Sequence, residues 1–189
     1  MAFKFPAENW EVLLNPERSE WQSVEVFLKA VNPSENEVWV DLGCGPGYFT
    51  LPLAKRVKKV YAVDLEEKML EVCEMRAREE GIENIEFVKC EEDRIPLPDE
   101  IADGVLMANL IHELIKPKEF LSEVKRISKP AAKIVVIDWH PLPSPAGPPL
   151  EERIPKEKAI EIMEDNGFVL EEDLDVYPYH YFLVFKNLQ

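Results

Sequence analysis

V-W-V-D-L-G-C-G-P-G-Y-F-T, residues 38–50, is the stretch that decides the fold. Its first three residues form a short apolar run, which is typical of a buried strand. Glycines then recur at alternate positions, and residues 48–56 have the pattern of a helix, with Pro52 early enough to fall where backbone N–H groups lack partners. Because glycine tolerates a positive φ and lets a ligand approach the backbone, the strand, turn and helix predict a nucleotide-type binding site.

The spacing of the glycines decides between classes of ligand. A dinucleotide-binding turn reads G-x-G-x-x-G, and its third glycine lets the helix pack closely on the strand. Here Gly43, Gly45 and Gly47 alternate, and Tyr48 stands where that third glycine would fall. The carboxylate of Asp41 would repel a pyrophosphate, whereas it suits a ligand that carries an ammonium and a sulfonium. A turn that binds no ligand is the structural alternative.

The segment D-L-G-C-G-P-G, residues 41–47, resembles the first motif of the class I S-adenosylmethionine (SAM)-dependent methyltransferases, which reads D/E-x-G-x-G-x-G. The resemblance extends over about residues 35–187, as five β/α units and a terminal hairpin. It implies an α/β fold: a Rossmann-like, seven-stranded, mostly parallel sheet with helices on both faces and a C-terminal antiparallel hairpin. It also implies SAM as the cofactor.

Acidic residues follow the second and third expected strands. The strand over residues 57–63 ends at Asp64, where a carboxylate can accept hydrogen bonds from both hydroxyls of a ribose. The strand over residues 85–88 leads into an acidic segment. The resemblance implies that a carboxylate here accepts a hydrogen bond from the adenine amino group. Alignment on the following I-P-L-P-D gives this place to Glu91, with Glu92 as the alternative. A second alternative is that the segment is an acidic surface loop that contacts no ligand.

A histidine follows the fourth expected strand, residues 102–107. Ligands bind at the carboxyl ends of strands in open parallel sheets, so residues 109–112 should face the methyl group. A similar segment carries a histidine in many methyltransferases of ubiquinone and menaquinone biosynthesis. His112 is therefore a candidate base or substrate hydrogen-bond donor, and a role in holding the loop is the alternative. His140 is the alternative histidine, and His180, in the terminal hairpin, should be remote.

The implied cofactor-binding set is Asp41, Gly43, Cys44, Gly45, Gly47, Asp64, Leu65, Glu91, Glu92, Asn109 and Leu110, with His112 as the candidate catalytic residue. The three cysteines form no C-x-x-C pair, which argues against a zinc site and a disulfide framework. No metal is expected.

Residues 1–34 are expected to form an N-terminal helical segment, and residues 35–189 the SAM-binding domain. The segment has no clear pattern before Pro16 and a helical pattern over residues 17–31. In the resembled family such a segment often lies over the cofactor cleft, and a helix that packs on the sheet without touching a ligand is the alternative. The remaining elements are helices over residues 66–80, 118–128 and 155–166, strands over 133–138, 168–176 and 179–186, and a stiff proline-rich connector, 141–149, on the cleft side.

Composition limits the partners and the location. A chain of 189 residues fits one domain with a sizeable core. A net charge of −15 argues against a large phosphate-binding face, so no nucleic acid is expected. The apolar runs are too short to span a bilayer, and the N-terminus lacks a signal-like core, so a cytoplasmic location is expected. High charge, many prolines and few glutamines hint at a thermophile.

The sequence therefore predicts methyl transfer from SAM to a small-molecule acceptor, in which a dedicated base is needed only if the nucleophile must lose a proton. One alternative is a protein or RNA methyltransferase, although no N/D-P-P-Y motif follows the fourth strand. Another is a SAM-binding regulator or non-catalytic partner. The acceptor, the methylated atom and the question of a homodimer stay open.

Overall fold

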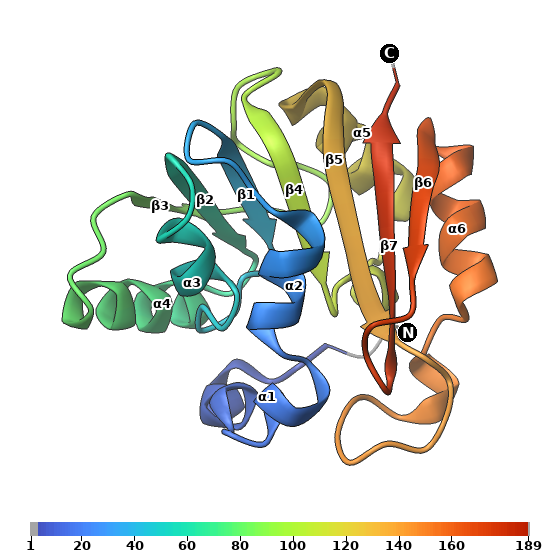
Figure 1. Cartoon of the computed structure of the whole chain (residues 1–189), viewed down its shortest axis with the longest axis horizontal. Helices are drawn as coiled ribbons and strands as arrows, with labels where there is room; N and C mark the ends of the chain where they lie inside the picture. The colour runs from blue at the N-terminus through green and yellow to red at the C-terminus, as the bar shows by residue number, and fades with distance from the viewer. Residues whose placement is uncertain (1–3, 189) are drawn as a thin grey trace.

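A seven-stranded sheet forms the centre of the computed structural model, which describes residues 4–188 (Figure 1). The strands are β1 Val38–Leu42, β2 Lys59–Asp64, β3 Ile85–Lys89, β4 Ala102–Ala108, β5 Ser128–Trp139, β6 Phe168–Leu174 and β7 His180–Asn187. They lie in the order β3-β2-β1-β4-β5-β7-β6. β7 runs antiparallel to β5 and β6, and the other neighbouring strands are parallel. This arrangement confirms the fold class expected from the sequence, including its closing antiparallel pair.

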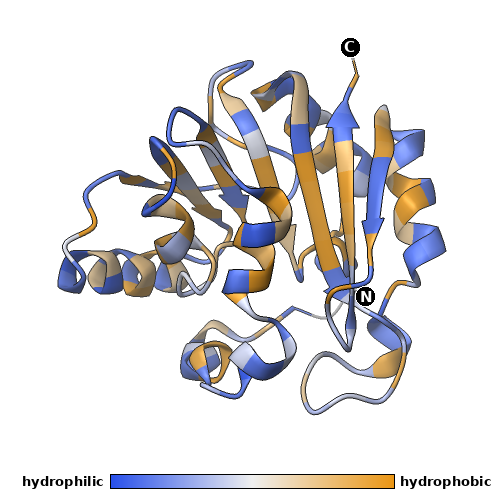
Figure 2. Cartoon of the chain, in the orientation of Figure 1, coloured by the Kyte–Doolittle hydropathy of each residue, from blue (hydrophilic) through white to orange (hydrophobic). Residues whose placement is uncertain are grey.

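Helices cover both faces of the sheet. They are η1 Ala7–Leu14, α1 Arg18–Trp21, α2 Val24–Val31, α3 Thr50–Ala54, α4 Glu67–Glu79, η2 Ile111–Glu113, α5 Pro117–Ile127, η3 Leu150–Glu152 and α6 Lys156–Asp165. α5 and α6 pack on one face, whereas α2, α3 and α4 pack on the other. Figure 2 shows hydrophobic central strands and helices of mixed polarity around them. Because both faces are covered, β1 needs apolar side chains on both: Trp39 is buried on the α2 side and Val40 on the α5 side.

The buried Trp39 shows how tightly this core is packed. Its ring is fully buried, and its partner in the register of the neighbouring strand β4 is Gly104. A Cβ atom at Gly104 would stand 2.3 Å from the Trp39 ring. The large residue on β1 therefore depends on the missing side chain on β4.

The prediction of a single helix over residues 17–31 is wrong, because this segment forms two helices, α1 and α2. The backbone of Gln22 leaves helical geometry (φ −145°, ψ 64°), which ends α1. The side chain of Gln22 forms a hydrogen bond with Asn109. Ser23 then begins α2 by accepting a hydrogen bond from the Val26 N–H at 3.4 Å. The preceding residues, which showed no clear pattern, form η1, with a kink at Asn9.

Two other elements differ in length from the expectation. β5 begins at Ser128, directly after α5, whereas the sequence predicted a strand from Lys133. Pro130 lies inside it, and Ala131, with φ 67°, accompanies a shift of register against β4. The helix expected over residues 48–56 is limited to α3. Within residues 4–188, no helix combines the length and the apolar character needed to cross a membrane.

Candidate active site

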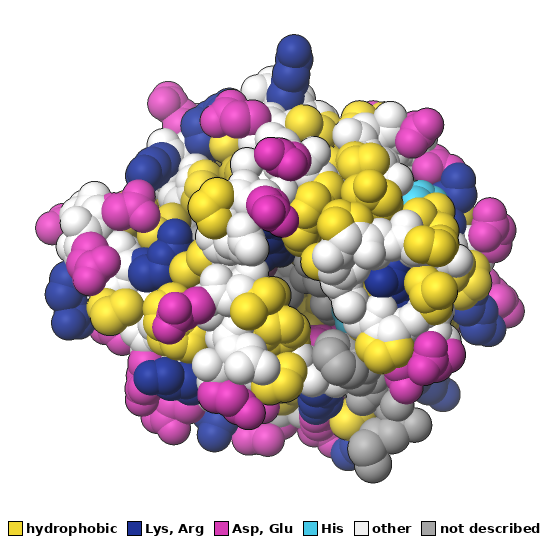
Figure 3. All heavy atoms as spheres, turned by 90° about the horizontal axis from the view of Figure 1, so that it is seen from below, with side chains coloured by type: hydrophobic (Ala, Val, Ile, Leu, Met, Phe, Trp, Pro, Cys, Tyr) yellow, Lys and Arg dark blue, Asp and Glu magenta, His cyan; other side chains and the backbone are white. Residues whose placement is uncertain are grey.

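A cavity of about 350 Å³ lies at the carboxyl edge of the sheet. Figure 3 looks at this edge from below and shows hydrophobic side chains on both sides of a hollow. The N-terminal segment covers part of the cavity through Lys4, Phe5, Val12, Leu13, Asn15, Glu17, Arg18 and Trp21. The predicted site residues on its wall are Asp41, Gly43, Cys44, Gly45, Asp64, Leu65, Glu92, Asn109, Leu110 and His112. Gly47 and Glu91 lie outside the lining.

The glycine turn is held against the end of β2 by backbone bonds. The N–H groups of Gly43 and Cys44 both donate to the Val63 carbonyl, at 2.8 and 3.0 Å. The Gly45 N–H donates to Asp64 Oδ2 at 2.9 Å. Gly45 has φ 55°, and among the described residues a Cβ there would meet only Leu13 Cδ1, at 3.7 Å. The turn therefore presents its backbone to the cavity, as the spacing of the glycines predicts.

Gly47 lies outside the lining of the cavity and packs against the core. A Cβ atom at this position would stand 2.6 Å from Leu51 Cδ1 and 2.8 Å from Cys73 Sγ. Its missing side chain therefore lets α3 and α4 approach the turn, and its contacts are with the core and not with the cavity. The sequence pattern grouped all three glycines because spacing alone does not say which way a Cβ would point.

Two carboxylates lie beside the turn. Asp41 is buried and accepts a hydrogen bond from Thr50 Oγ1 at 2.6 Å. Burial raises the pKa of Asp41 to about 7, although the bond from Thr50 lowers it. Asp64 is also held by the Glu66 N–H, at 2.9 Å, and burial raises its pKa above the usual value. Both groups are preorganised, and a cation or hydroxyl donor in the cavity would lower their pKa values.

Of the two adjacent glutamates, the structure puts Glu92 on the cavity wall. Glu92 forms an ion pair with Lys4. Glu91 is exposed, and its backbone N–H donates to the Arg94 carbonyl. Glu91, which the alignment favoured, therefore faces away from the cavity that the other predicted residues share. The side chains of two adjacent residues in a loop can point in different directions. A sequence alignment does not resolve which of them faces the cavity.

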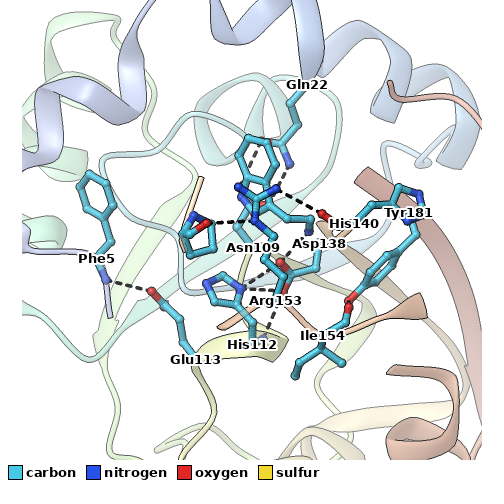
Figure 4. Close-up of polar contacts among 12 residues, drawn as sticks. Phe5, Gln22, Asn109, His112, Glu113, Asp138, His140, Arg153, Ile154 and Tyr181 are labelled. Carbon is cyan, nitrogen blue, oxygen red and sulfur yellow. Dashed lines mark hydrogen bonds and ion pairs between the residues drawn. The ribbon is translucent and has the colours of Figure 1, made fainter. Parts of the chain in front are cut away.

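Asn109 joins the end of β4 to the N-terminal segment. Its side chain exchanges two hydrogen bonds with Gln22, both at 3.1 Å (Figure 4). Its backbone has φ 58°, and its N–H donates to the Ile137 carbonyl at 2.7 Å. The Tyr48 hydroxyl donates to the Gln22 carbonyl at 2.7 Å, so the break between α1 and α2 is fixed over the cavity from two sides. Sequence analysis missed Gln22, because nothing near it in the chain signals this pairing.

His112 and Asp138 form a buried pair beside the cavity (Figure 4). Nδ1 of His112 lies 2.8 and 2.9 Å from the two carboxylate oxygens of Asp138. The backbone N–H groups of His112 and Trp139 also donate to that carboxylate, at 3.2 and 2.7 Å. Burial lowers the pKa of His112, but the charge and hydrogen bond of Asp138 outweigh burial and raise it above 6.5. Asp138 thus holds the ring of His112 through Nδ1.

A second acid neighbours this pair. Glu113 lines the cavity and accepts a hydrogen bond from the Phe5 N–H at 3.0 Å. Burial raises the pKa of Glu113 to about 7, although the charge of His112 lowers it. Sequence analysis missed Glu113 as a residue of the cavity wall and Asp138 as the partner of His112. Asp138 was recognised only as the end of a strand, and the parallel register of β4 and β5 is what brings it to His112.

The other two histidines lie outside the lining of the cavity. His140, the alternative candidate, is half-buried, and its backbone N–H donates to the Tyr179 carbonyl. His180 is buried against Trp139, with 3.9 Å between ring centroids, and burial lowers its pKa to about 2. It was expected to be remote, yet Trp139 is a cavity residue, so His180 supports the wall from behind.

The proline-rich connector covers the cavity beside Trp139, as expected, and Pro145, Ala146, Gly147 and Pro148 line it. Arg153 fastens it. Its guanidinium donates to the carbonyls of Pro148 and Leu142, both at 2.9 Å, and to those of His140 and Ala146, both at 3.2 Å. The same group lies 5.0 Å from the centre of the Trp139 ring. The described residues contain no cluster of three or more His, Cys, Asp or Glu side chains that could hold a metal ion.

Comparison with known proteins gives one family. The family described as "methyltransferase domain" matches residues 40–136. Demethylmenaquinone methyltransferase of Clavibacter sepedonicus is 32% identical over 117 residues, which cover 62% of this chain and 47% of that protein. A ubiquinone/menaquinone biosynthesis C-methyltransferase of Ectopseudomonas mendocina is 26% identical over 163 residues, 84% of this chain and 61% of that protein. The chain thus spans about half the length of the curated relatives it matches.

A solved structure matches over its whole length. The crystal structure of a SAM-dependent methyltransferase from Aquifex aeolicus superposes with a TM-score of 0.93 at 33% sequence identity. The match covers 98% of this chain and 100% of that one. The match therefore includes the N-terminal segment over the cavity as well as the sheet.

Proposed function

Since this chain belongs to the methyltransferase domain family and to the class I SAM-dependent methyltransferases, we propose that it transfers the methyl group of SAM to a small-molecule acceptor. SAM is the cofactor of the family, and when bound it supplies a methyl group on a sulfonium. The observation that carries the proposal is that His112 lies on the wall of the same cavity as the glycine turn and is held from behind by the buried Asp138, whose Oδ1 lies 2.8 Å from Nδ1.

The residues of the turn fit the cofactor. Gly45 presents backbone where a Cβ would project, and Asp64 is fixed at the end of β2, where a carboxylate suits ribose hydroxyls. Asp41 and Glu92 add negative charge that suits the ammonium and the adenine amino group. These assignments, including Glu92 in place of Glu91, are part of the proposal.

His112 is proposed as the base. Asp138 accepts the Nδ1–H hydrogen bond and holds the ring, so Nε2 can take a proton from the acceptor as its nucleophile attacks the methyl carbon. The rest of the catalysis is alignment of the nucleophile and exclusion of water, which the covering segments favour. The acceptor class is then a molecule whose nucleophile carries a removable proton, such as a hydroxyl or an acidic C–H.

The wall near His112 favours a flat, apolar acceptor. Trp21 and Trp139 lie with ring centroids 5.2 Å apart, and both line the cavity with Pro145 and Pro148. Such surfaces pack well against a planar ring. The relatives named for demethylmenaquinone and for ubiquinone/menaquinone biosynthesis support an acceptor of this kind. A nucleic acid is disfavoured by the net charge of −15.

Calorimetry followed by a turnover assay tests the proposal. The purified chain should bind SAM and S-adenosylhomocysteine, and it should not bind NAD. With SAM and a pool of hydroxylated or demethylated aromatic compounds, mass spectrometry should show a product heavier by one methylene group. Tight NAD binding would contradict the cofactor assignment. Binding of SAM without turnover of any pool would favour the alternative, a SAM-binding regulator or non-catalytic partner. The cytoplasmic location, the thermophilic source and the homodimer stay predictions from the sequence.

A further inference from the structure

His180 is a buried imidazole whose ring nitrogens have no partner within the described chain. The residue is 1% exposed, and it begins β7 directly opposite Trp139, the last residue of β5. Among residues 4–188, neither Nδ1 nor Nε2 of His180 meets a hydrogen-bond partner. Aromatic rings surround it instead. The centroid of the Trp139 ring lies 3.9 Å away, and those of Trp21 and Tyr177 each lie 6.0 Å away.

Aromatic packing alone does not explain a histidine at this place. Burial, and after it the charge of Arg18, lower the pKa of His180 to about 2, so the ring is neutral near pH 7. A neutral imidazole has one N–H donor and one acceptor nitrogen. Leaving both buried and unpaired is unfavourable, whereas a phenyl ring of similar shape would avoid that cost. The two nitrogens therefore suit a polar partner from outside the chain.

Trp21 and Trp139 separate His180 from the cavity, since both contact its ring and both line the cavity. The two indoles are held differently. Trp139 is buried, and the Arg153 guanidinium lies 5.0 Å from the centre of its ring. Trp21 is half-buried, and it ends α1 immediately before the backbone leaves helical geometry at Gln22. Of the two rings, Trp21 is therefore the one that a ligand can displace without disturbing the sheet.

We propose that His180 is the polar end of the acceptor site: a planar acceptor displaces the Trp21 indole, packs against Trp139 and forms a hydrogen bond with His180 through an oxygen. This inference rests on the proposed function and deepens it. The acceptor then carries two polar groups, the nucleophile that faces His112 and a second oxygen that His180 recognises. The alternative is that His180 only fills the aromatic cluster and contacts no acceptor.

The experiment compares dihydroxynaphthalenes with naphthols on the intact chain saturated with S-adenosylhomocysteine. The 1,4-, 1,5- and 2,6-diols, handled under argon, place the second hydroxyl at different distances from the first, and 1- and 2-naphthol lack it. Calorimetry should show that the wild type binds at least one diol roughly 10-fold more tightly than the matching naphthol, as expected for one buried hydrogen-bonded oxygen. In His180→Phe that preference should fall to within about 2-fold, while the affinity for the naphthol is kept.

Two amide variants and one spectrum separate recognition from packing. His180→Asn and His180→Gln each keep a donor and an acceptor, at two different reaches, so one of them should retain part of the preference for the diol. A residue that only fills space predicts no such rescue. Long-range ¹H–¹⁵N NMR of histidine-labelled wild type should show the His180 nitrogens shifting with the preferred diol and not with the naphthol. His140→Phe is the matched control, because His140 lies outside the cavity lining and the variant should keep the preference.

The outcomes are distinct, and thermal melts report whether each variant folds. If the wild type prefers no diol, if His180→Phe keeps the preference, or if the nitrogens of His180 do not shift, the inference is overturned while the cofactor assignment stands. Equal weakening of diol and naphthol in His180→Phe would show that the ring only shapes the wall, which also overturns it. If S-adenosylhomocysteine binds but none of the five naphthalene compounds does, the planar acceptor of the proposed function fails, and the inference fails with it. If S-adenosylhomocysteine does not bind, the proposed function itself fails and takes the inference with it.

Discussion

The two sides of the cavity are built by different means. The turn side comprises Asp41, the glycine turn of residues 43–47 and Asp64. The histidine side comprises Asn109, His112 and Asp138. On the turn side the decisive contacts use the backbone, such as the bond from the Gly45 N–H to Asp64. On the histidine side they join side chains, as in the pair of His112 with Asp138 and that of Asn109 with Gln22, 87 residues away in the chain.

The charges of the two sides differ as well. The turn side holds buried carboxylates without a cation in contact, and burial raises the pKa of both Asp41 and Asp64. The histidine side holds an acid and a base already in contact, and that contact raises the pKa of His112. The first arrangement is suited to binding a positively charged ligand and the second to moving a proton. We therefore expect a mutation on the turn side to affect SAM binding and a mutation on the histidine side to affect turnover.

His112→Ala should have the largest effect, and it should fall on turnover alone. Loss of a general base costs about 10²–10⁴ in kcat. The affinity for SAM should change little, because the turn side is intact. Steady-state kinetics and calorimetry on one preparation measure both quantities. The matched control is His140→Ala, since His140 lies outside the cavity lining and should keep nearly full activity. Full activity of His112→Ala would end the catalytic assignment and leave positioning alone.

Gly45→Val should weaken SAM binding by about 100-fold or more while the chain still folds. At φ 55° a β-branched residue is strained, and its side chain would enter the wall of the cavity, where the new Cβ would lie 3.7 Å from Leu13 Cδ1. Gly81→Val is a matched control, because Gly81 has φ 69° and no atom of residues 4–188 lies within 4 Å of its Cβ position. It should lose similar thermal stability and keep the affinity for SAM. Equal loss of affinity in both variants would show a general effect on folding.

The difference between the turn side and the histidine side also explains which features could be predicted from the sequence. The fold and the turn side were predictable because a positive φ and backbone contact require glycine, and that requirement leaves a regular spacing in the chain. Asp64 follows its strand directly, so its place is local as well. The contacts of Asp138 with His112 and of Gln22 with Asn109 were not predictable, since strand register and tertiary packing bring these residues together. For a related reason the sequence did not decide between Glu91 and Glu92: which of two adjacent side chains in a loop faces inward is set by tertiary contacts.

Asp138→Asn should change the pH dependence of activity without abolishing activity. If His112 is the base, it works as neutral imidazole, and activity should be lost as the pH falls through the pKa of His112, which Asp138 raises above 6.5. An amide removes the negative charge, so the midpoint should move to lower pH. It also disturbs the tautomer, and we expect kcat to fall by about 10- to 100-fold. The measurement is a pH–rate profile at saturating SAM. An unchanged midpoint with lowered kcat would mean that Asp138 positions the ring but that His112 does not set the profile.

Glu92→Gln should have the smallest effect, and it tests whether the turn side extends to β3. If Glu92 accepts a hydrogen bond from the adenine amino group, its amide can still accept one, and affinity for S-adenosylhomocysteine should fall only a few-fold, by about 1 kcal/mol. Glu91→Gln should have no effect, because Glu91 is exposed outside the cavity. Glu92→Gln also removes the ion pair between Glu92 and Lys4, so Lys4→Met serves as the control for loss of that ion pair.

S-inosylhomocysteine, which lacks the adenine amino group, gives the decisive comparison. The wild type should prefer the adenosyl ligand, and Glu92→Gln should lose part of that preference while Lys4→Met keeps it. A loss confined to Glu91→Gln would restore the alignment and show that the loop turns over when the cofactor binds.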